Sequence, residues 1–443
     1  MQQITSYCRS ATLRHTLLCG LSITLLGSLF IYLDHFGINL PLLNTLTGLL
    51  SLYLLLISST RTWFFSGFFF GLLWFWWIGL SFIHYHMSWA IPFVVLFIAL
   101  VYGGLFWLIA KTAALVDSRW SIVNRSVATQ RKPKLIPTPY SLLPLITKAL
   151  GLLILSYIHP FTFDWFKPEL MFVESFIGIQ KWQFSLVLLA LVLTIWRKQP
   201  LFLLLILLSY SPVRPEIHTQ SNDHIQLVTT HTPVEEKWDK NRHKKQFTTL
   251  LHTIDQAIDA NKTLIILPES VFPVFLKRNV SLFNVLKKRA QHINIVTGAL
   301  YWDGITPRNS TYIFTTDGKV LIANKVILVP FGEANPLPDF LSDWINKVFY
   351  DDAVDYQASS NVVDYTVDGK TYRNAICFEA TSERLYEGKP KCMIVLSNNG
   401  WFTPSIEPTL QRLLLQYYSR KYGTTIYHAV NMAPSYIISQ GTP

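Results

Sequence analysis

The first half of the chain alternates between long apolar stretches and short polar segments. The apolar stretches cover residues 16–33, 38–58, 63–82, 89–110, 141–158, 182–196 and 200–210. A helix needs about 20 apolar residues to cross the hydrocarbon core of a bilayer. The pattern therefore predicts a multi-pass bundle of about seven membrane helices over residues 1–212. The last two stretches are short for a crossing, so whether they form two separate membrane helices is left open.

Basic residues gather at alternate ends of these stretches. Arg9 and Arg14 precede the first stretch, Arg61 follows the second, and the segment 111–134, which contains six Lys and Arg residues, follows the fourth. Basic loops of membrane proteins stay on the cytoplasmic side. Seven crossings from a cytoplasmic start would place everything after the bundle outside, so we expect a cell inner-membrane protein of a Gram-negative bacterium with a periplasmic domain.

From about residue 213 the pattern changes to short β-rich runs alternating with amphipathic helices. Strands are predicted at 225–230, 263–267, 293–301, 310–316, 320–329, 372–377, 393–397, 425–430 and 436–439. Helices are predicted at 247–258, where apolar residues recur at helical spacing, at 285–292 and 409–422, and from 381–383 onward. Strands interleaved with helices indicate an α/β layered domain over residues 213–443.

Composition supports a membrane protein and argues against two other classes. Half of the residues are hydrophobic, 15% are charged, and the chain has 14 Trp, 20 Tyr and 29 Phe. The net charge of +11 lies largely between apolar stretches, where membrane topology explains it better than nucleic-acid binding. The four cysteines are too few for a disulfide scaffold. Cys8 and Cys19 belong to the first stretch, so only Cys377 and Cys392 could pair, which is disfavoured if one thiol is needed for chemistry.

The segment 159–166 combines polar residues with Phe and Trp side chains. It is too polar to cross a bilayer and too aromatic for an ordinary loop. Because aromatic residues favour the headgroup layer, the segment is expected to be interfacial. An aromatic belt without a ligand and a lipid-contacting role remain equally open.

Three apolar strands of the second half lead into reactive side chains. The run 264–267 leads to Glu269, the run 320–329 contains Lys325 and leads to Glu333, and the run 372–376 leads to Cys377. Strand ends of one sheet can converge in a single crevice, and a helix opening beside Cys377 would stabilise its thiolate. A thiol needs a base, and a lysine can stabilise an oxyanion. Each residue alone also has an ordinary structural explanation.

Together these residues resemble a known constellation. Pro268–Glu269, Lys325 with the following 328–333 segment, and Cys377–Glu379 are similar to the Glu-Lys-Cys triad of the nitrilase (carbon-nitrogen hydrolase) superfamily. With the preceding membrane stretches, the chain resembles the apolipoprotein N-acyltransferase family. The resemblance implies a membrane bundle plus an α/β nitrilase-like α-β-β-α sandwich, with no cofactor or metal.

The resemblance also implies a two-step acyl transfer. Glu269 would take the Cys377 proton, and the thiolate would accept an acyl chain from a phospholipid of the bilayer, for which the resemblance implies phosphatidylethanolamine. Lys325 and a backbone N–H after Cys377 would face the oxyanion. The α-amine of a diacylglyceryl-cysteine apolipoprotein would then take the acyl chain from the thioester. Supporting roles fall to residues that hold or shape the site: Glu333, Glu379, Phe378, Trp238 and Asn309.

The chain departs from the family pattern at several positions. Phe378 stands where tyrosine is common, Arg412 follows Gln411 where histidine is usual, and Tyr427–His428 replace an arginine region. The family usually continues beyond Pro443 through more strand and a membrane helix, which indicates a natural loss or an incomplete chain. Two other functions stay open: a membrane-anchored nitrilase-type amidase for a small amide, and a non-catalytic membrane binding protein.

Overall fold

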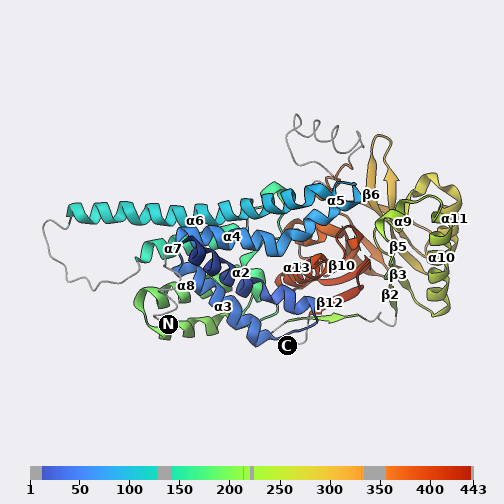
Figure 1. The fold of residues 1–443 in the computed structure, drawn as a ribbon. Coiled ribbons are helices and arrows are strands. Elements are labelled where there is room, and N and C mark those ends of the chain that lie inside the picture. The colour runs from blue at the N-terminus through green and yellow to red at the C-terminus, as the bar shows by residue number, and fades with distance from the viewer. Residues whose placement is uncertain are drawn as a thin grey trace. The chain divides into compact units, whose positions relative to one another are not determined.

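The computed structural model describes residues 12–127, 141–212, 214–219, 224–330, 332–333 and 356–440 (Figure 1). Within this chain Cys8, Arg9, Phe331 and the end of the basic segment, from residue 128 onward, lie outside the described residues. The chain divides into two compact units. The membrane unit comprises Met1–Pro160 with Phe166–Pro212, and the second unit comprises Phe161–Trp165 with Val213–Pro443.

The membrane unit is helical, as the apolar pattern predicts. Its elements are α2 (Leu13–His35), α3 (Pro41–Ile57), α4 (Thr60–Phe75), η1 (Trp76–Leu80), α5 (Ser81–His84), η2 (Ser88–Ala90), α6 (Ile91–Val127), α7 (Leu142–Leu155), η5 (Pro168–Phe172), α8 (Lys181–Arg197) and η6 (Pro200–Ser209). Among the described residues, three segments are long and apolar enough to cross a membrane: Leu13–His35, Thr60–His84 and Ser88–Ser118. The seventh apolar stretch forms the 3-10 helix η6 rather than an α-helix.

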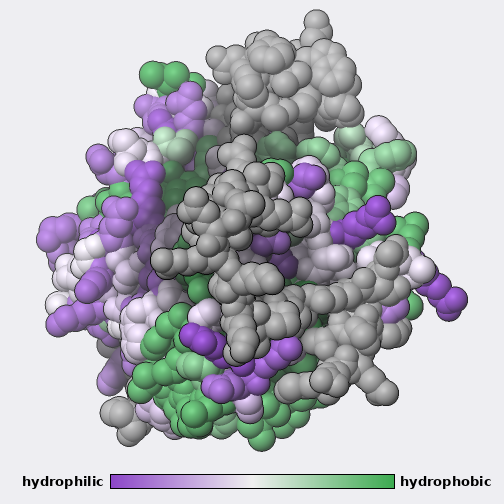
Figure 2. All heavy atoms as spheres, turned by 90° about the vertical axis from the view of Figure 1, so that its left-hand side faces the viewer, coloured by the Kyte–Doolittle hydropathy of each residue, from purple (hydrophilic) through white to green (hydrophobic). Residues whose placement is uncertain are grey.

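Small residues and aromatic rings pack the interior of the membrane unit. A Cβ on Gly67 would lie 2.5 Å from the backbone oxygen of Tyr102, so only glycine allows α4 to approach α6 so closely here. Phe166 packs against the rings of Phe70 and Trp74. Many leucine and phenylalanine side chains instead face outward, and Figure 2 shows large hydrophobic areas on the surface. Exposed apolar surface of this extent is typical of protein that contacts lipid.

The second unit contains two β-sheets. One has the order β1-β12-β11-β10-β9-β8 and comprises β1 (Pro215–His218), β8 (Asp364–Val367), β9 (Lys370–Ile376), β10 (Cys392–Asn398), β11 (Thr425–Asn431) and β12 (Tyr436–Gln440). The other has the order β2-β3-β5-β6-β7, with β4 paired to β5, and comprises β2 (Ile225–Leu227), β3 (Leu264–Ile266), β4 (Phe272–Phe275), β5 (Asn294–Trp302), β6 (Pro307–Phe314) and β7 (Val320–Asn324). β1, β4 and β8 were not expected from the sequence.

Alternate residues of β3 show how the layers are built. Ile265 packs in a core with Ile254 of α10 (His243–Asp259) and Leu286 of α11 (Val280–Arg289). The next residue, Ile266, packs in a second core with Ile394 of β10. Since successive side chains of a strand point to opposite faces, one face of this sheet meets helices and the other meets the second sheet.

A further helix, α13 (Glu407–Tyr422), contacts β11 and β12 of that second sheet. Figure 1 shows the resulting sequence of helices, sheet, sheet and helix in the second unit. The predicted α-β-β-α sandwich is thereby confirmed. The short helix α9 (Val234–Trp238) was not expected from the sequence.

Candidate active site

The three reactive side chains come from two sheets, not from one as expected. Glu269 follows β3 and Lys325 follows β7 in the same sheet, whereas Cys377 follows β9 in the facing sheet. The predicted strand 320–329 was too long, because β7 ends at Asn324 and Lys325 begins the loop. The site therefore lies where strand ends of two stacked sheets meet.

A glycine allows Glu269 to lie against the neighbouring strand. A Cβ on Gly298 of β5 would lie 2.7 Å from the Cα of Glu269 and 2.3 Å from the backbone nitrogen of Ser270. Ser270 itself has a φ of 48°, in the left-handed region that non-glycine residues seldom adopt. The backbone after β3 is thus bent sharply enough to turn the Glu269 carboxylate into the site.

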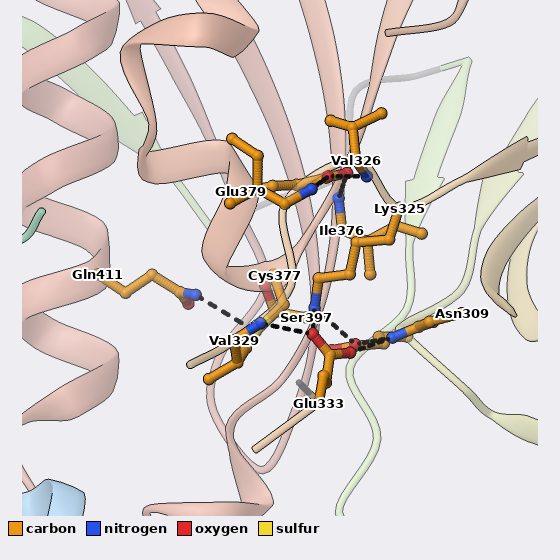
Figure 3. Close-up of polar contacts among 12 residues, drawn as sticks. Asn309, Lys325, Val326, Val329, Glu333, Ile376, Cys377, Glu379, Ser397 and Gln411 are labelled. Carbon is orange, nitrogen blue, oxygen red and sulfur yellow. Dashed lines mark hydrogen bonds and ion pairs between the residues drawn. The ribbon is translucent and has the colours of Figure 1, made fainter. Parts of the chain in front are cut away.

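Lys325 lies between two carboxylates (Figure 3). Its Nζ is 2.6 Å from Glu333 Oε2 and 3.7 Å from Glu269 Oε1, and its side chain is only 1% exposed. Asn309 links the two carboxylates, because its Nδ2 donates to Glu269 Oε1 at 2.7 Å and to Glu333 Oε1 at 2.8 Å. The backbone N–H of Val329 donates to the other oxygen of Glu333 at 2.9 Å. Four groups therefore hold each other in one orientation.

The charge of Lys325 is maintained despite its burial. Burial by itself lowers the pKa of a lysine, but the negative charges of Glu333 and then Glu269 outweigh it and raise the pKa of Lys325 above its ordinary value. The lysine is accordingly a permanent cation in the site. A buried cation held by fixed carboxylates needs little reorganisation to stabilise a developing negative charge.

Cys377 directly follows β9, which ends at Ile376, and is the first residue of a 3-10 turn, η8 (Cys377–Thr381). Its φ of 54° is unusual for a residue with a side chain and directs the thiol out of the strand. The helix expected to open at 381–383 is absent from the described chain there; η8 and a second 3-10 turn, η9 (Glu383–Tyr386), occupy the position. Burial, followed by the charge of Glu269, raises the pKa of the thiol, while Lys325 lowers it. The resting thiol is therefore protonated and depends on a base.

Glu379 connects the lysine loop to the cysteine strand. Its Oε2 accepts from the backbone N–H of Val326 at 2.6 Å and of Ile327 at 3.1 Å, and its Oε1 accepts from that of Ile376 at 2.8 Å (Figure 3). Burial raises the pKa of Glu379 to about 7, against the lowering effects of Lys325 and of these three N–H groups. One side chain thus fixes the backbone beside both Lys325 and Cys377.

Phe378 is covered by the aromatic segment that the sequence placed at a membrane interface. Phe163 and Trp165 stack on it with ring centroids 5.6 Å and 6.1 Å away. Trp165 Nε1 donates to Thr381 Oγ1 at 2.7 Å, and that hydroxyl donates to the backbone oxygen of Phe378 at 2.6 Å. Phe161–Trp165 therefore belongs structurally to the second unit and supports the residue next to the thiol.

Lys237 is a site residue that matches the family pattern in sequence but to which the sequence reasoning gave no role. Its Nζ donates to the backbone oxygen of Glu269 at 3.0 Å, and the residue is 2% exposed. Burial lowers the pKa of Lys237 to about 8, although Glu269 and Cys377 act in the opposite direction. Its neighbour Trp238, expected to shape the site, is 38% exposed. The sequence held one signal for Lys237: it directly precedes Trp238, which was already a candidate site residue.

Polar residues from α13 complete the surroundings of the thiol. Gln411 Nε2 lies 3.8 Å from Cys377 Sγ. Figure 3 marks this contact with a dashed line. His428, one of the departures from the family pattern, is buried within β11, where its Nε2 lies 2.6 Å from Ser397 Oγ. No cluster of three metal-ligating side chains occurs in the described part of the chain.

Known proteins are similar to this chain over most of its length. Residues 14–212 match the family model of the apolipoprotein N-acyltransferase integral membrane domain. The apolipoprotein N-acyltransferase of Wolinella succinogenes is 42% identical over 94% of this chain and 94% of that protein. The chain belongs to the apolipoprotein N-acyltransferase family. The enzyme of that name from Helicobacter pylori is 35% identical over 92% of this chain and 91% of its own length.

Solved structures with similar folds are more distant. A CN-hydrolase superfamily protein from Xanthomonas campestris is 15% identical, with a TM-score of 0.34 over 47% of this chain and 75% of that chain. An amidase from Nesterenkonia sp. is 13% identical, with a TM-score of 0.35 over 48% of this chain and 78% of that chain. Family membership confirms the resemblance stated from sequence, and with it that this chain is a membrane-embedded acyltransferase.

Proposed function

We propose that the chain transfers an acyl chain from a phospholipid to the N-terminal amine of a diacylglyceryl-cysteine apolipoprotein, through a thioester on Cys377. The observation that carries this proposal is the buried Lys325 cation, held by Glu269 and Glu333 beside a thiol whose pKa is raised. Such a thiol reacts only when a base removes its proton as the bond forms. Glu269 is the carboxylate available for that task, and Glu333 keeps the lysine in place.

In the first half-reaction, the Cys377 proton passes to Glu269 while Sγ attacks the ester carbonyl of the phospholipid. The carbonyl oxygen becomes an oxyanion, which Lys325 and the N–H of Phe378 stabilise. The carbon–oxygen bond to the glycerol then breaks, and the departing alkoxide takes the proton from Glu269. A lysophospholipid leaves, and a thioester remains.

In the second half-reaction, the free α-amine of the lipoprotein attacks the thioester carbonyl. Glu269 accepts a proton from the attacking nitrogen, the carbon–sulfur bond breaks, and the thiolate regains a proton from Glu269. An amide forms, and the enzyme returns to its starting state. Lys237, close enough to interact with both Glu269 and Cys377, adds positive charge next to the carboxylate that shuttles the proton.

Both substrates are amphiphiles, which favours an enzyme with its own membrane unit. The positive-inside pattern of the apolar stretches favours the inner membrane, with residues 213–443 as a periplasmic catalytic domain. Phosphatidylethanolamine is the proposed acyl donor, because the family resemblance implies it.

The test is to trap the acyl-enzyme. The full chain in detergent micelles is incubated with phosphatidylethanolamine carrying a labelled acyl chain, and labelled peptides are mapped. We expect label on Cys377 that hydroxylamine removes, none in Cys377→Ser, and parent-level label in Cys392→Ser, the matched buried cysteine. Transfer to a diacylglyceryl peptide without label on Cys377 would contradict the thioester mechanism. Parallel incubation with phosphatidylglycerol decides the donor class.

A further inference from the structure

Three buried polar side chains form a chain of hydrogen bonds that ends at the thiol. Asn399 Nδ2 donates to Glu407 Oε2 at 2.7 Å and to Gln411 Oε1 at 3.1 Å, and Gln411 Nε2 donates to Cys377 Sγ at 3.8 Å. Asn399, Glu407 and Gln411 are at most 2% exposed. These three residues belong neither to the triad of Glu269, Lys325 and Cys377 nor to the residues described above that hold the triad in place.

The bonds determine which way each amide faces. An amide nitrogen carries two hydrogens, and an amide oxygen only accepts. Asn399 uses both hydrogens, one towards each residue of α13. Since the oxygen of Gln411 is thereby occupied by a donor, its nitrogen is the atom that points at Cys377. The thiol is met by a fixed N–H donor.

A fixed N–H donor stabilises the negatively charged thiolate of Cys377 more than the neutral thiol. An N–H group binds a negatively charged sulfur much more strongly than a neutral thiol, because hydrogen bonds to ionised groups are roughly twice as strong as neutral ones. Negative charge develops on Sγ as the proton leaves and again when the thioester breaks. Gln411 belongs to α13, whereas Lys325 belongs to the loop that follows β7 of the facing sheet.

We propose that Gln411 is a further catalytic residue, which stabilises negative charge on Cys377 Sγ, and that Asn399 and Glu407 are positioning residues that orient it. This inference rests on Cys377 being the nucleophile of the proposed function. The arrangement requires only that the N–H remain directed at the sulfur while the acyl chain enters and leaves.

The protonation of Glu407 fits this role. Burial raises the pKa of Glu407 to about 8, against the donated N–H of Asn399 and with a further rise from Glu269. Around neutral pH the side chain is therefore mainly an uncharged acid that still offers an oxygen to Asn399. It fixes the amides without adding a negative charge beside a sulfur that must itself become negative.

The other explanation is that the three residues only pack α13 against the sheet. In that case their loss would lower the melting temperature but would leave the chemistry of the folded thiol unchanged. The experiment must therefore measure the reactivity of the Cys377 thiol itself.

The experiment measures the rate of Cys377 alkylation by iodoacetamide in the folded full chain from pH 6 to 10, by mass spectrometry of the Cys377 peptide. We expect Gln411→Leu, which keeps the size but removes the donor, to slow alkylation at pH 8 about tenfold and to shift the pH profile upward. Asn399→Ala should slow it about threefold, because Gln411 can then rotate. Gln416→Leu is the matched control, a buried glutamine on the same helix, and should leave the profile unchanged.

Parent-like profiles in Gln411→Leu and Asn399→Ala would overturn the inference. If Gln411→Leu does not fold, Gln411→Met, which is similar in size and has no N–H or O–H donor, is measured in its place, and a parent-like profile there is equally fatal. Because alkylation requires no acyl donor, a changed profile supports stabilisation of the Cys377 thiolate by Gln411 whether or not labelled phospholipid forms a thioester. A missing thioester in the parent would count against the proposed function alone.

Discussion

Both units of the chain pair a lysine with a buried carboxylate, but the number of carboxylates around the lysine differs. In the membrane unit, Glu169 forms an ion pair with Lys181 and accepts from Ser156 Oγ at 2.6 Å. In the second unit, Lys325 is shared by Glu269 and Glu333, and Asn309 also joins these carboxylates. Placing two carboxylates around one buried cation is unfavourable for stability alone, since buried charges carry a large desolvation penalty. The presence of a second carboxylate beside Lys325 is explained if one of the two carboxylates has to accept and release a proton during the reaction.

The largest expected effect tests this difference directly. Lys325→Met should reduce acyl-enzyme formation about 1,000-fold, because it removes the cation that faces the oxyanion and leaves two carboxylates to repel each other. Lys181→Met should instead lower stability by about 3 kcal/mol, because the buried Glu169 loses its ion pair with Lys181, while the folded fraction keeps near-parent rates. Thioester formation and thermal unfolding are measured for both. Equal loss of rate in the two variants would remove the distinction.

A second pair of substitutions compares close contacts in the two units. Gly298→Ala places a methyl group against the backbone of Glu269, whereas Gly67→Ala places one against Tyr102 in the membrane unit. A shift of about 1 Å in a catalytic group can reduce a rate about 100-fold. We expect that loss of kcat for Gly298→Ala, and lower stability with little change in kcat for Gly67→Ala. Acyl-enzyme kinetics and melting temperatures separate the two results.

Sequence reasoning succeeded where side-chain pattern alone determines the structure. The run Leu264–Leu267 is apolar on both faces because one face meets helices and the other meets a sheet, so a continuous apolar strand was the correct interpretation. The strand 320–329 was extended too far because Leu328 and Val329 continue the apolar run. In the structure Glu379 and Glu333 bind backbone N–H groups of that segment and keep it out of the sheet.

The site residues that received no role from the sequence depend on contacts between distant segments. Lys237 reaches Glu269, and Gln411 reaches Cys377, across separations that no local pattern reports. One signal was present: Glu407 and Gln411 are four residues apart, and thus on the same face of a helix, and both are buried in α13. Polar residues on the buried face of a helix require partners, which is a reason to look for a site there.

A third comparison is between two buried carboxyl groups: Glu407, which has no ion pair with a cation in the described part of the chain, and Glu169, which is paired with Lys181. The pKa of Glu407 is raised to about 8, so the folded protein holds a proton that the unfolded chain, with an ordinary glutamate, releases above about pH 4.5. Folding stability from this group is complete below that pH and declines as the pH rises towards 8. Glu407→Gln, which mimics the protonated acid, should reduce the fall in the free energy of unfolding between low and high pH by a few kcal/mol. Melting curves from pH 5 to 9 test the prediction.

Glu169→Gln provides the control for that measurement. Its partner is the cation Lys181, so neutralising it removes an ion pair at every pH in the range. We expect a roughly uniform loss of stability across the pH range, in contrast with the flattened slope of Glu407→Gln. A parallel slope in Glu407→Gln and the parent would mean that Glu407 is ionised in the folded protein.

The smallest expected effect compares two buried tryptophans that each donate to a hydroxyl. Trp165 Nε1 donates to Thr381 Oγ1 at 2.7 Å beside Phe378, and Trp74 Nε1 donates to Ser28 Oγ at 2.9 Å within the membrane unit. Replacing either with Phe leaves one hydroxyl without its donor and should lower stability by about 1 kcal/mol. Only Trp165→Phe should also reduce acyl-enzyme formation, about twofold to threefold, because Thr381 holds the backbone oxygen of Phe378 and so the N–H next to the thiol. If Trp74→Phe slows the reaction as much, the aromatic segment has no special connection to the nucleophile, and the loss of rate reflects loosened packing in general.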